Sequence, residues 1–175
     1  MSNIRVAKTI EAKKIGAFFD DVVLYMDNRG ENYPKWTYKV YPSTSFAVSM
    51  AEKGQLYLAI EDGELLGEFV LNEDPQGDYE KGKWSKDLKR GEFLVCHSLA
   101  VAPSSFGKGI GEAMGALVIR KAKEEGYKAV RLDVAPGNFP AIRLYEKCGF
   151  SYIGDEDLDR GYDFIPKFSL MEYNF

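Results

Sequence analysis

A short glycine-rich stretch, Gly107-Lys108-Gly109-Ile110-Gly111, has the clearest chemical use in the sequence. Glycine lets the backbone turn tightly and has no Cβ to hold a ligand away. Residues 112–125 contain no proline and predict a helix, whose first N–H groups and dipole also attract an anion. The stretch therefore predicts a site for a diphosphate.

Two well-known phosphate loops do not fit this spacing. A Walker loop needs Ser or Thr directly after the lysine, but Gly109 follows Lys108. The dinucleotide fingerprint is Gly-x-Gly-x-x-Gly, whereas the spacing here is Gly-x-Gly-x-Gly. The alternative without a ligand is a glycine-rich turn that only starts a helix.

His97 is the one histidine of the chain and a candidate general base, since its ordinary pKa lies near neutrality. It interrupts an otherwise apolar run, Phe93–Val101, that is typical of a central strand covered on both faces. The alternative is a structural histidine of the core. Glu68, Glu92 and a chain of waters are further routes for the proton.

Periodicity and turn residues predict the remaining elements. Further strands are expected at residues 4–8, 55–60, 65–71, 128–134, 150–153 and 167–173. Three more helices are expected, capped by Thr9, Ser43 and Asn138 and ended near Gly30, Lys53 and Gly149. A right-handed crossover makes 128–134 parallel to the central strand. The sequence therefore predicts a mixed α/β sheet.

Composition excludes several classes of protein. The 175 residues are 45% apolar and 29% charged, as in one ordinary globular domain. The net charge is 23 − 27 = −4, which argues against a general nucleic-acid surface. No stretch has the length of a membrane span, and no secretory signal is recognised, so a cytoplasmic location is expected. Cys96 and Cys148 have no metal-site spacing, so no metal is expected.

Two motifs in the second half carry a resemblance to a known family. They are LAVAPSSFGKGIG and GNFPAIRLYEKCGF, with VRLDV between them. Residues 93–154 thus resemble the GNAT superfamily of N-acetyltransferases. The resemblance implies one domain over residues 1–175, with a mostly antiparallel sheet of six or seven strands and about four helices. It also implies that the parallel strands splay apart near Leu99 and Leu132 to admit acetyl-CoA.

The family's loop reads Gln/Arg-x-x-Gly-x-Gly/Ala, and Gly109 and Gly111 match its two small positions. Phe106 stands where Gln or Arg is usual, which removes one donor and leaves the backbone amides. By the resemblance, the cofactor contacts are Leu99, Ala100, Val101, Phe106, Gly107, Lys108, Gly109, Ile110, Gly111, Glu112, Asn138 and Tyr145. The N–H of Leu99 is the expected donor to the thioester carbonyl.

Tyr145 matches the family's general acid, which protonates the leaving thiolate, and a phenol stays protonated at neutral pH. The alternative role of Tyr145 is packing on the buried face of an amphipathic helix. Asn138 matches the family's asparagine before this helix, but an asparagine that only caps the helix would give the same sequence pattern. A route through an acylated Cys148 is a further alternative, although a helical position indicates packing.

The expected reaction is direct attack of a primary amine on acetyl-CoA in a ternary complex. The expected acceptor is a small molecule. The alternatives are a protein N-terminus or lysine, or a non-catalytic acyl-CoA-binding module, for which Phe106 is the hint. Residues 31–42 are rich in aromatics and either cover the core or, as in the family, line the acceptor pocket. Residues 72–90 are a solvated loop or a wall of that pocket. No nucleic-acid or membrane partner is expected, and a homodimer is allowed.

Overall fold

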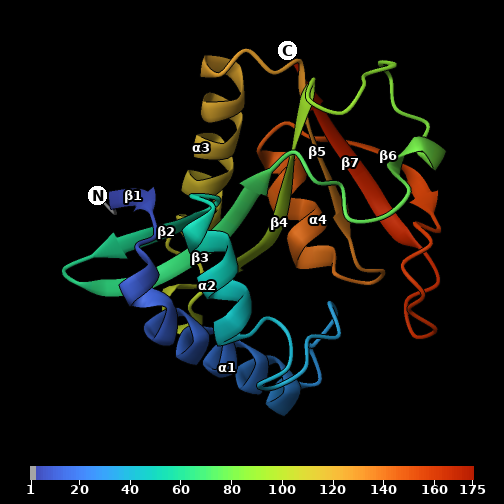
Figure 1. Ribbon diagram of the computed structural model, residues 1–175. Helices are drawn as coiled ribbons and strands as arrows, with labels where there is room; N and C mark the ends of the chain where they lie inside the picture. The colour runs from blue at the N-terminus through green and yellow to red at the C-terminus, as the bar shows by residue number, and fades with distance from the viewer. Residues whose placement is uncertain (1–2) are drawn as a thin grey trace. The chain divides into compact units, whose positions relative to one another are not determined.

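A computed structural model describes residues 3–175, which form seven strands and four α-helices (Figure 1). In chain order these are β1 Asn3–Val6, α1 Ala12–Arg29, α2 Thr44–Glu52, β2 Leu56–Glu61, β3 Glu64–Asn72, β4 Phe93–Val101, α3 Ile110–Glu124, β5 Ala129–Val134, α4 Phe139–Lys147, β6 Ser151–Glu156 and β7 Phe168–Asn174. Within residues 3–175, none of the helices combines the length and the apolar character that a membrane crossing requires.

The strands form one mixed sheet in the order β1-β2-β3-β4-β5-β7-β6. Strands β4 and β5 are parallel, whereas β1 with β2, β2 with β3, β5 with β7 and β6 with β7 are antiparallel. The prediction of a mostly antiparallel sheet with one parallel pair and about four helices is therefore confirmed. The parallel register runs from Phe93 with Ala129 to Val95 with Arg131, although both strands continue beyond it.

The chain divides into two compact units. Unit 1 holds residues 3–71 and Ser98–Met114, and unit 2 holds Asn72–His97 and Gly115–Phe175. Strand β4 passes from unit 2 to unit 1 after His97, and helix α3 passes from unit 1 to unit 2 after Met114. A single domain over the whole chain stays a prediction.

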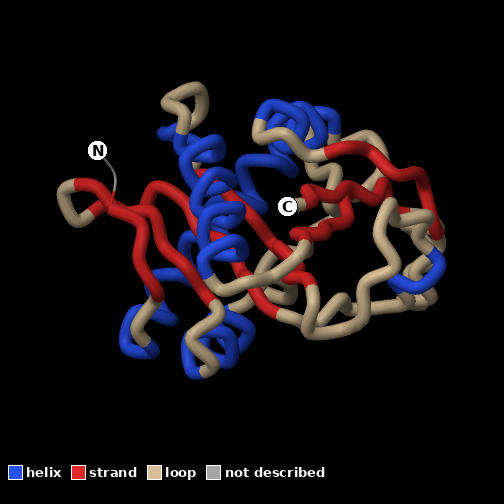
Figure 2. The backbone as a smooth tube through the Cα atoms, turned by 90° about the horizontal axis from the view of Figure 1, so that it is seen from above, coloured by secondary structure: helices blue, strands red, loops and turns tan. Residues whose placement is uncertain are grey.

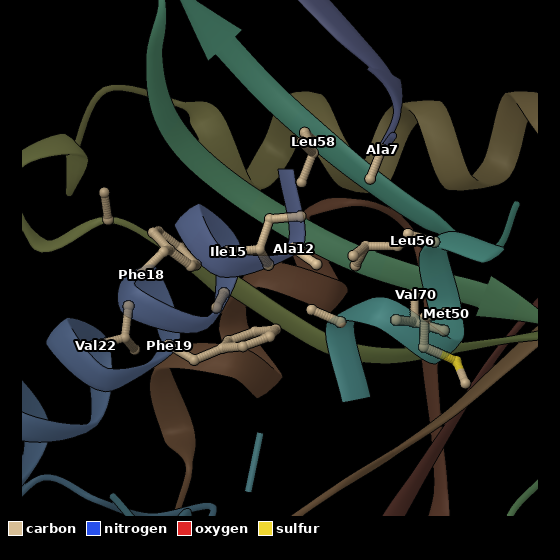
Figure 3. Close-up of a cluster of buried hydrophobic side chains, with 14 residues drawn as sticks. Ala7, Ala12, Ile15, Phe18, Phe19, Val22, Met50, Leu56, Leu58 and Val70 are labelled. Atoms are coloured by element: carbon tan, nitrogen blue, oxygen red, sulfur yellow. The ribbon is translucent and has the colours of Figure 1, made fainter. Parts of the chain in front are cut away.

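The core of unit 1 lies between the β2–β3 hairpin and the helices α1 and α2 (Figure 3). The side chains of Phe19 and Ile15 from α1 meet Leu56 and Leu58 of β2 there. The two helices approach closely at Gly16, where an added Cβ would lie 2.0 Å from the hydroxyl oxygen of Thr44.

Aromatic residues of the segment between α1 and α2 cover this core. The ring of Trp36 meets Phe19 edge-on with a centroid distance of 6.4 Å, and Tyr41 meets Phe46 at 5.3 Å. The partly buried Trp36 and Phe46 belong to the same apolar cluster. For Trp36 the structure favours the core interpretation, whereas Tyr41 packs on Phe46 and stays exposed.

The predicted cap at Thr9 is wrong. Residues Thr9–Glu11 form a 3-10 turn, and α1 begins at Ala12. The backbone N–H of Lys8 donates to the carboxylate of Glu11 at 2.8 Å. Two hydrogen bonds from Arg5 hold that carboxylate and lower the pKa of Glu11 to about 2. The ion pair between Glu11 and Arg5 of β1 therefore organises the start of α1, in place of the predicted Thr9 hydroxyl. The other two caps are confirmed: Ser43 accepts the N–H of Phe46, and Asn138 accepts that of Ala141.

In unit 2, the antiparallel strands β5, β7 and β6 share a core with the segment that joins β3 to β4. That segment is mostly loop with one short helical turn, Tyr79–Lys81 (Figure 2). Strand β6 continues to Glu156, so Asp155 and Glu156 belong to a strand and the predicted end at Ile153 is wrong. The hydroxyl of Ser169 on β7 donates to Asp155 at 2.7 Å, which explains the longer pairing.

Candidate active site

The glycine-rich loop lies in unit 1 and presents backbone donors. Gly107 and Gly109 have φ of 75° and 76°, in the left-handed region that other residues rarely adopt. The carbonyl of Gly109 accepts the N–H of Ala113 at 3.0 Å, as at the start of a helix. Within residues 3–175, the amides of Gly107, Gly109, Ile110 and Gly111 donate to no backbone carbonyl. The loop thus has the unpaired donors that an anion site requires.

Phe106, which directly precedes Gly107, packs against helix α1. Its side chain is half-exposed, and its ring meets that of Tyr25 edge-on with a centroid distance of 5.5 Å. The guanidinium of Arg29 lies 5.5 Å from the centroid of the same tyrosine ring. Phe106 therefore makes an apolar contact where the family pattern has a polar donor.

Gly67 of β3 lets the end of β4 and the start of α3 come close together. A Cβ at this position would lie 2.8 Å from the carbonyl oxygen of Ala100 and 2.8 Å from the terminal methyl of Met114. Leu99 and Val101 lie on the same stretch of β4, directly after Ser98, whose φ of 48° breaks the regular strand geometry. Contacts inside unit 1 therefore position the strand that leads into the loop.

His97 lies in unit 2 and is buried. Its Nε2 lies 3.1 Å from Oδ1 of Asn72, the last residue of β3. Burial lowers the pKa of His97, and the negative charge of Asp133 acts in the opposite direction. The imidazole is therefore neutral near pH 7, which is the form that accepts a proton.

A polar network that the sequence analysis missed surrounds Asp133 of β5. Its carboxylate accepts the hydroxyl of Tyr79 at 2.5 Å and two hydrogen bonds from Arg160 at 2.6 and 2.8 Å. Arg160 lies between β6 and β7, and Tyr79 lies between β3 and β4. Because three distant segments supply these groups, no local motif could have revealed the network.

Tyr145 and Asn138 lie on and before α4, in unit 2. Tyr145 is buried, and its ring meets Phe150 edge-on with a centroid distance of 5.6 Å. Asn138 accepts the N–H of Ala141 at 3.3 Å and therefore caps the helix that carries the tyrosine. Cys148, which follows α4, packs against Gly115 of α3. That contact supports a packing role for the thiol.

The two candidate glutamates have opposite environments. Glu68 is fully buried in unit 1, both of its carboxylate oxygens lack a hydrogen-bond partner within residues 3–175, and burial raises its pKa well above 4.5. Glu92 forms an ion pair with Lys128 and accepts the N–H of Lys89 at 2.8 Å. These contacts lower the pKa of Glu92, with the Lys128 hydrogen bond as the larger cause. The Glu92 carboxylate is thus already bound by the Lys128 ammonium and the Lys89 N–H.

The expected site residues are therefore divided between the units. Leu99, Ala100, Val101 and residues 106–112 lie in unit 1, whereas His97, Asn138 and Tyr145 lie in unit 2. Continuous chain connects His97 to Leu99 within β4. The individual roles of these residues stay predictions.

Comparison with known proteins places the chain in a family. Residues 23–150 match the model of the acetyltransferase (GNAT) family. A mycothiol acetyltransferase of Acidothermus cellulolyticus is 34% identical over 109 residues, or 60% of this chain and 32% of the relative. The chain thus spans about a third of the length of the curated relatives it matches.

Solved structures show the same fold. The putative acetyltransferase yncA from Salmonella typhimurium, solved with acetyl-CoA, gives a TM-score of 0.71 at 17% identity over 99% of this chain and 94% of that chain. Aminoglycoside acetyltransferase AAC(6')-Ib, solved with coenzyme A and kanamycin, gives a TM-score of 0.70 at 17% identity. This match covers 99% of this chain and 95% of that chain. The chain belongs to the GNAT family of acetyltransferases.

Proposed function

We propose that the protein is an acetyl-CoA-dependent N-acetyltransferase that moves the acetyl group to a primary amine by direct attack in a ternary complex. The observation that carries this proposal is the loop of residues 106–111 in a chain of the GNAT family. Its two left-handed glycines and four unpaired amides suit the diphosphate of coenzyme A. Phe106 supplies no side-chain donor, so the backbone carries the binding.

The reaction needs a base for the amine, a donor to the oxyanion and an acid for the thiolate. His97 is the proposed base, because it is neutral and buried. The N–H of Leu99 is the proposed donor, and Tyr145 the proposed acid. Burial and hydrogen bonding orient these groups: Asn72 holds His97, and Phe150 packs on the tyrosine ring.

The proposed acceptor is a small molecule. Two named relatives support this choice, since one is a mycothiol acetyltransferase and another was solved with kanamycin. In this chain Trp36 and Tyr41 pack on Phe19 and Phe46. The aromatic segment before α2 is therefore ordered by contacts with the core.

A turnover assay tests the proposal directly. Release of free coenzyme A thiol is followed with a chromogenic disulfide across a panel of small primary amines, lysine-bearing peptides and peptide N-termini. We expect turnover with at least one small amine and a rise in melting temperature with acetyl-CoA, because a ligand that binds only the folded state stabilises it. Stabilisation by acetyl-CoA without turnover on any amine supports the acyl-CoA-binding module instead. No stabilisation and no turnover contradict the proposal.

A further inference from the structure

A cavity of about 710 Å³ in unit 2 is lined mainly by the segment that joins β3 to β4. Phe93 of β4 and Arg131 of β5 line it together with residues of that segment. The lining residues from the segment are Pro75, Gly77, Asp78, Tyr79, Glu80, Gly82, Trp84, Lys86, Asp87, Leu88, Lys89 and Arg90. The volume is in the range of about 300–1,000 Å³ that small-molecule sites have.

Arg131 is the cationic group that distinguishes this cavity. Its side chain is 3% exposed, and its guanidinium carbon lies 4.4 Å from the ring centroid of Trp84 and 4.3 Å from that of Phe93. One of its nitrogens, Nη2, donates to the carbonyl of Lys86 at 2.8 Å. Within residues 3–175 this is the one hydrogen bond of a group with five N–H donors, and Nε is buried without a partner.

Glu172 of β7 does not satisfy the guanidinium. Its Oε2 lies 3.9 Å from Nε of Arg131, which is beyond hydrogen-bond distance, and it also lacks a partner in the described chain. The other oxygen, Oε1, accepts both the N–H and the hydroxyl of Ser85. Glu172 therefore anchors the loop at Ser85 and forms only a long ion pair with Arg131, whose Nη1 makes no hydrogen bond within residues 3–175.

The lining carries charges of both signs. Four cationic side chains line the cavity, against the three carboxylates of Asp78, Glu80 and Asp87, and one of the four, Arg90, pairs with Asp74. Asp78 also accepts the N–H of Glu80 at 3.2 Å. Among the described residues, Lys89 has no ion-pair partner for its ammonium group. A guanidinium fork is suited to a carboxylate, which accepts two parallel hydrogen bonds.

Aromatic and aliphatic side chains form part of the wall. The rings of Tyr79 and Trp84 are tilted by 30° at a centroid distance of 5.3 Å, and Leu88 also lies in the lining. We propose that this cavity is a binding site for a small carboxylate with an aromatic body, held by Arg131 and packed against Tyr79 and Trp84. The proposal uses residues of unit 2 alone and does not rest on acetyl transfer.

Trp84 is a built-in reporter for the test. The chain has two tryptophans, so Trp36→Phe leaves Trp84 as the only indole. This variant is titrated with benzoate and with benzamide, its neutral analogue, at constant ionic strength, with sodium chloride as the reference. We expect a saturable change in fluorescence with benzoate and an affinity at least about tenfold weaker for benzamide, because charge-assisted hydrogen bonds are the stronger ones.

A second comparison uses Arg131→Gln combined with Glu172→Gln, which removes both buried charges together and avoids leaving one unpaired. We expect benzoate affinity to fall at least about tenfold, whereas Lys83→Gln, in the same segment but outside the lining, leaves it unchanged. Circular dichroism and melting curves establish that each variant is folded. No saturable response to benzoate, equal affinity for benzamide, or unchanged affinity in the folded double variant each overturns the proposal. If the double variant does not fold, the comparison of benzoate with benzamide decides.

Discussion

The Nε2 atom of His97 lies 3.1 Å from Oδ1 of Asn72, and that oxygen also accepts the backbone N–H of Asp74 at 2.9 Å. An oxygen that already accepts a backbone N–H is an acceptor toward the histidine as well, so Nε2 carries the hydrogen. The neutral ring then has its lone pair on Nδ1. This arrangement gives His97 a defined tautomer with one nitrogen that accepts a proton.

His97→Gln should lower kcat/KM by roughly 10²–10⁴-fold, the usual range for a positioned base, and remove the acidic limb of its pH profile. Glutamine keeps an N–H for Asn72 and has no proton acceptor of suitable pKa. The measurement is a pH–rate profile on a confirmed amine, corrected for the fraction of folded protein. A normal rate per folded molecule with a lowered melting temperature would make His97 a core residue.

The same residue gives a pH-dependent stability. Burial lowers the pKa of His97 in the folded protein below the ordinary 6.5. The contribution of His97 to the free energy of unfolding is therefore fully present above pH 6.5. It is lost as the pH falls through the pKa of the folded state, because in this range the unfolded chain binds a proton at His97 that the folded protein does not. Urea unfolding across this range should show a steeper decline for the wild type than for His97→Gln.

Gly109→Glu should abolish the rise in melting temperature that acetyl-CoA causes. The substitution places bulk and negative charge among the amides that are proposed to hold the diphosphate. Gly54→Glu is the matched control, because Gly54 also has a left-handed φ, 66° against 76°, and open space around an added Cβ. It has comparable backbone strain outside the loop. Equal acetyl-CoA shifts in the two folded variants would show that the cofactor does not bind at this loop.

Tyr145→Phe should lower kcat by roughly 10²–10⁴-fold while the fold and the KM for acetyl-CoA stay near normal. The change removes one hydroxyl and keeps the ring against Phe150. Tyr173→Phe serves as the control, since Tyr173 also packs against Phe150, with a centroid distance of 5.8 Å. If both variants turn over at the wild-type rate, Tyr145 has a packing role only.

The central strand could be predicted from the sequence with its observed bounds, Phe93–Val101. A long apolar run that stops before Pro103 admits few other structures. Other boundaries depended on partners far along the chain. Glu11 displaced Thr9 as the organiser of a helix start because Arg5 holds its carboxylate, and β6 continued because Asp155 bonds to Ser169. Such contacts leave no local pattern.

The candidate site was predictable where a backbone feature is involved and not where side chains meet. The positive φ of Gly107 and Gly109 follows from glycine spacing. In contrast, Tyr79, Asp133 and Arg160 come from three separate segments and have no periodic relation. The partner of His97 was likewise hidden, because the sequence predicts Asn72 as the first residue of the loop 72–90, whereas the structure places it at the end of β3.

Gly115→Ala should destabilise the protein, although alanine is the better helix former by about 1 kcal/mol. A Cβ at this position of α3 would lie 2.6 Å from the sulfur of Cys148. Overpacking of this kind typically costs about 1–3 kcal/mol. The double variant Gly115→Ala with Cys148→Ala should recover part of the loss, since the next contact, with Cβ of Cys148, is 3.5 Å. Urea unfolding of the wild type, the two single variants and the double variant measures the coupling free energy between the two positions. If the two single changes in unfolding free energy simply add in the double variant, the contact is contradicted.

Glu68→Gln should change the pH dependence of stability in the direction opposite to Glu92→Gln. Burial raises the pKa of Glu68 in the folded protein, so its contribution is fully present below the ordinary 4.5 and is lost as the pH rises through the folded pKa. The ion pair with Lys128 lowers the pKa of Glu92, so its contribution is present above 4.5 and is lost as the pH falls. Urea unfolding of the three proteins from acid to mildly alkaline pH measures both effects.

Glutamine is a neutral amide of nearly the same shape as a protonated glutamate. We therefore expect Glu68→Gln to be more stable than the wild type at alkaline pH. There the wild-type protein loses stability, because the buried Glu68 carboxyl must either ionise in the core or stay protonated at a pH where the unfolded chain releases the proton. Glu92→Gln should be less stable than the wild type at neutral pH, with a small effect because that pair is exposed. The same variants report on catalysis: a normal kcat/KM in Glu68→Gln excludes Glu68 as the proton acceptor, whereas a loss comparable with that of His97→Gln would move the base from the histidine to the buried glutamate.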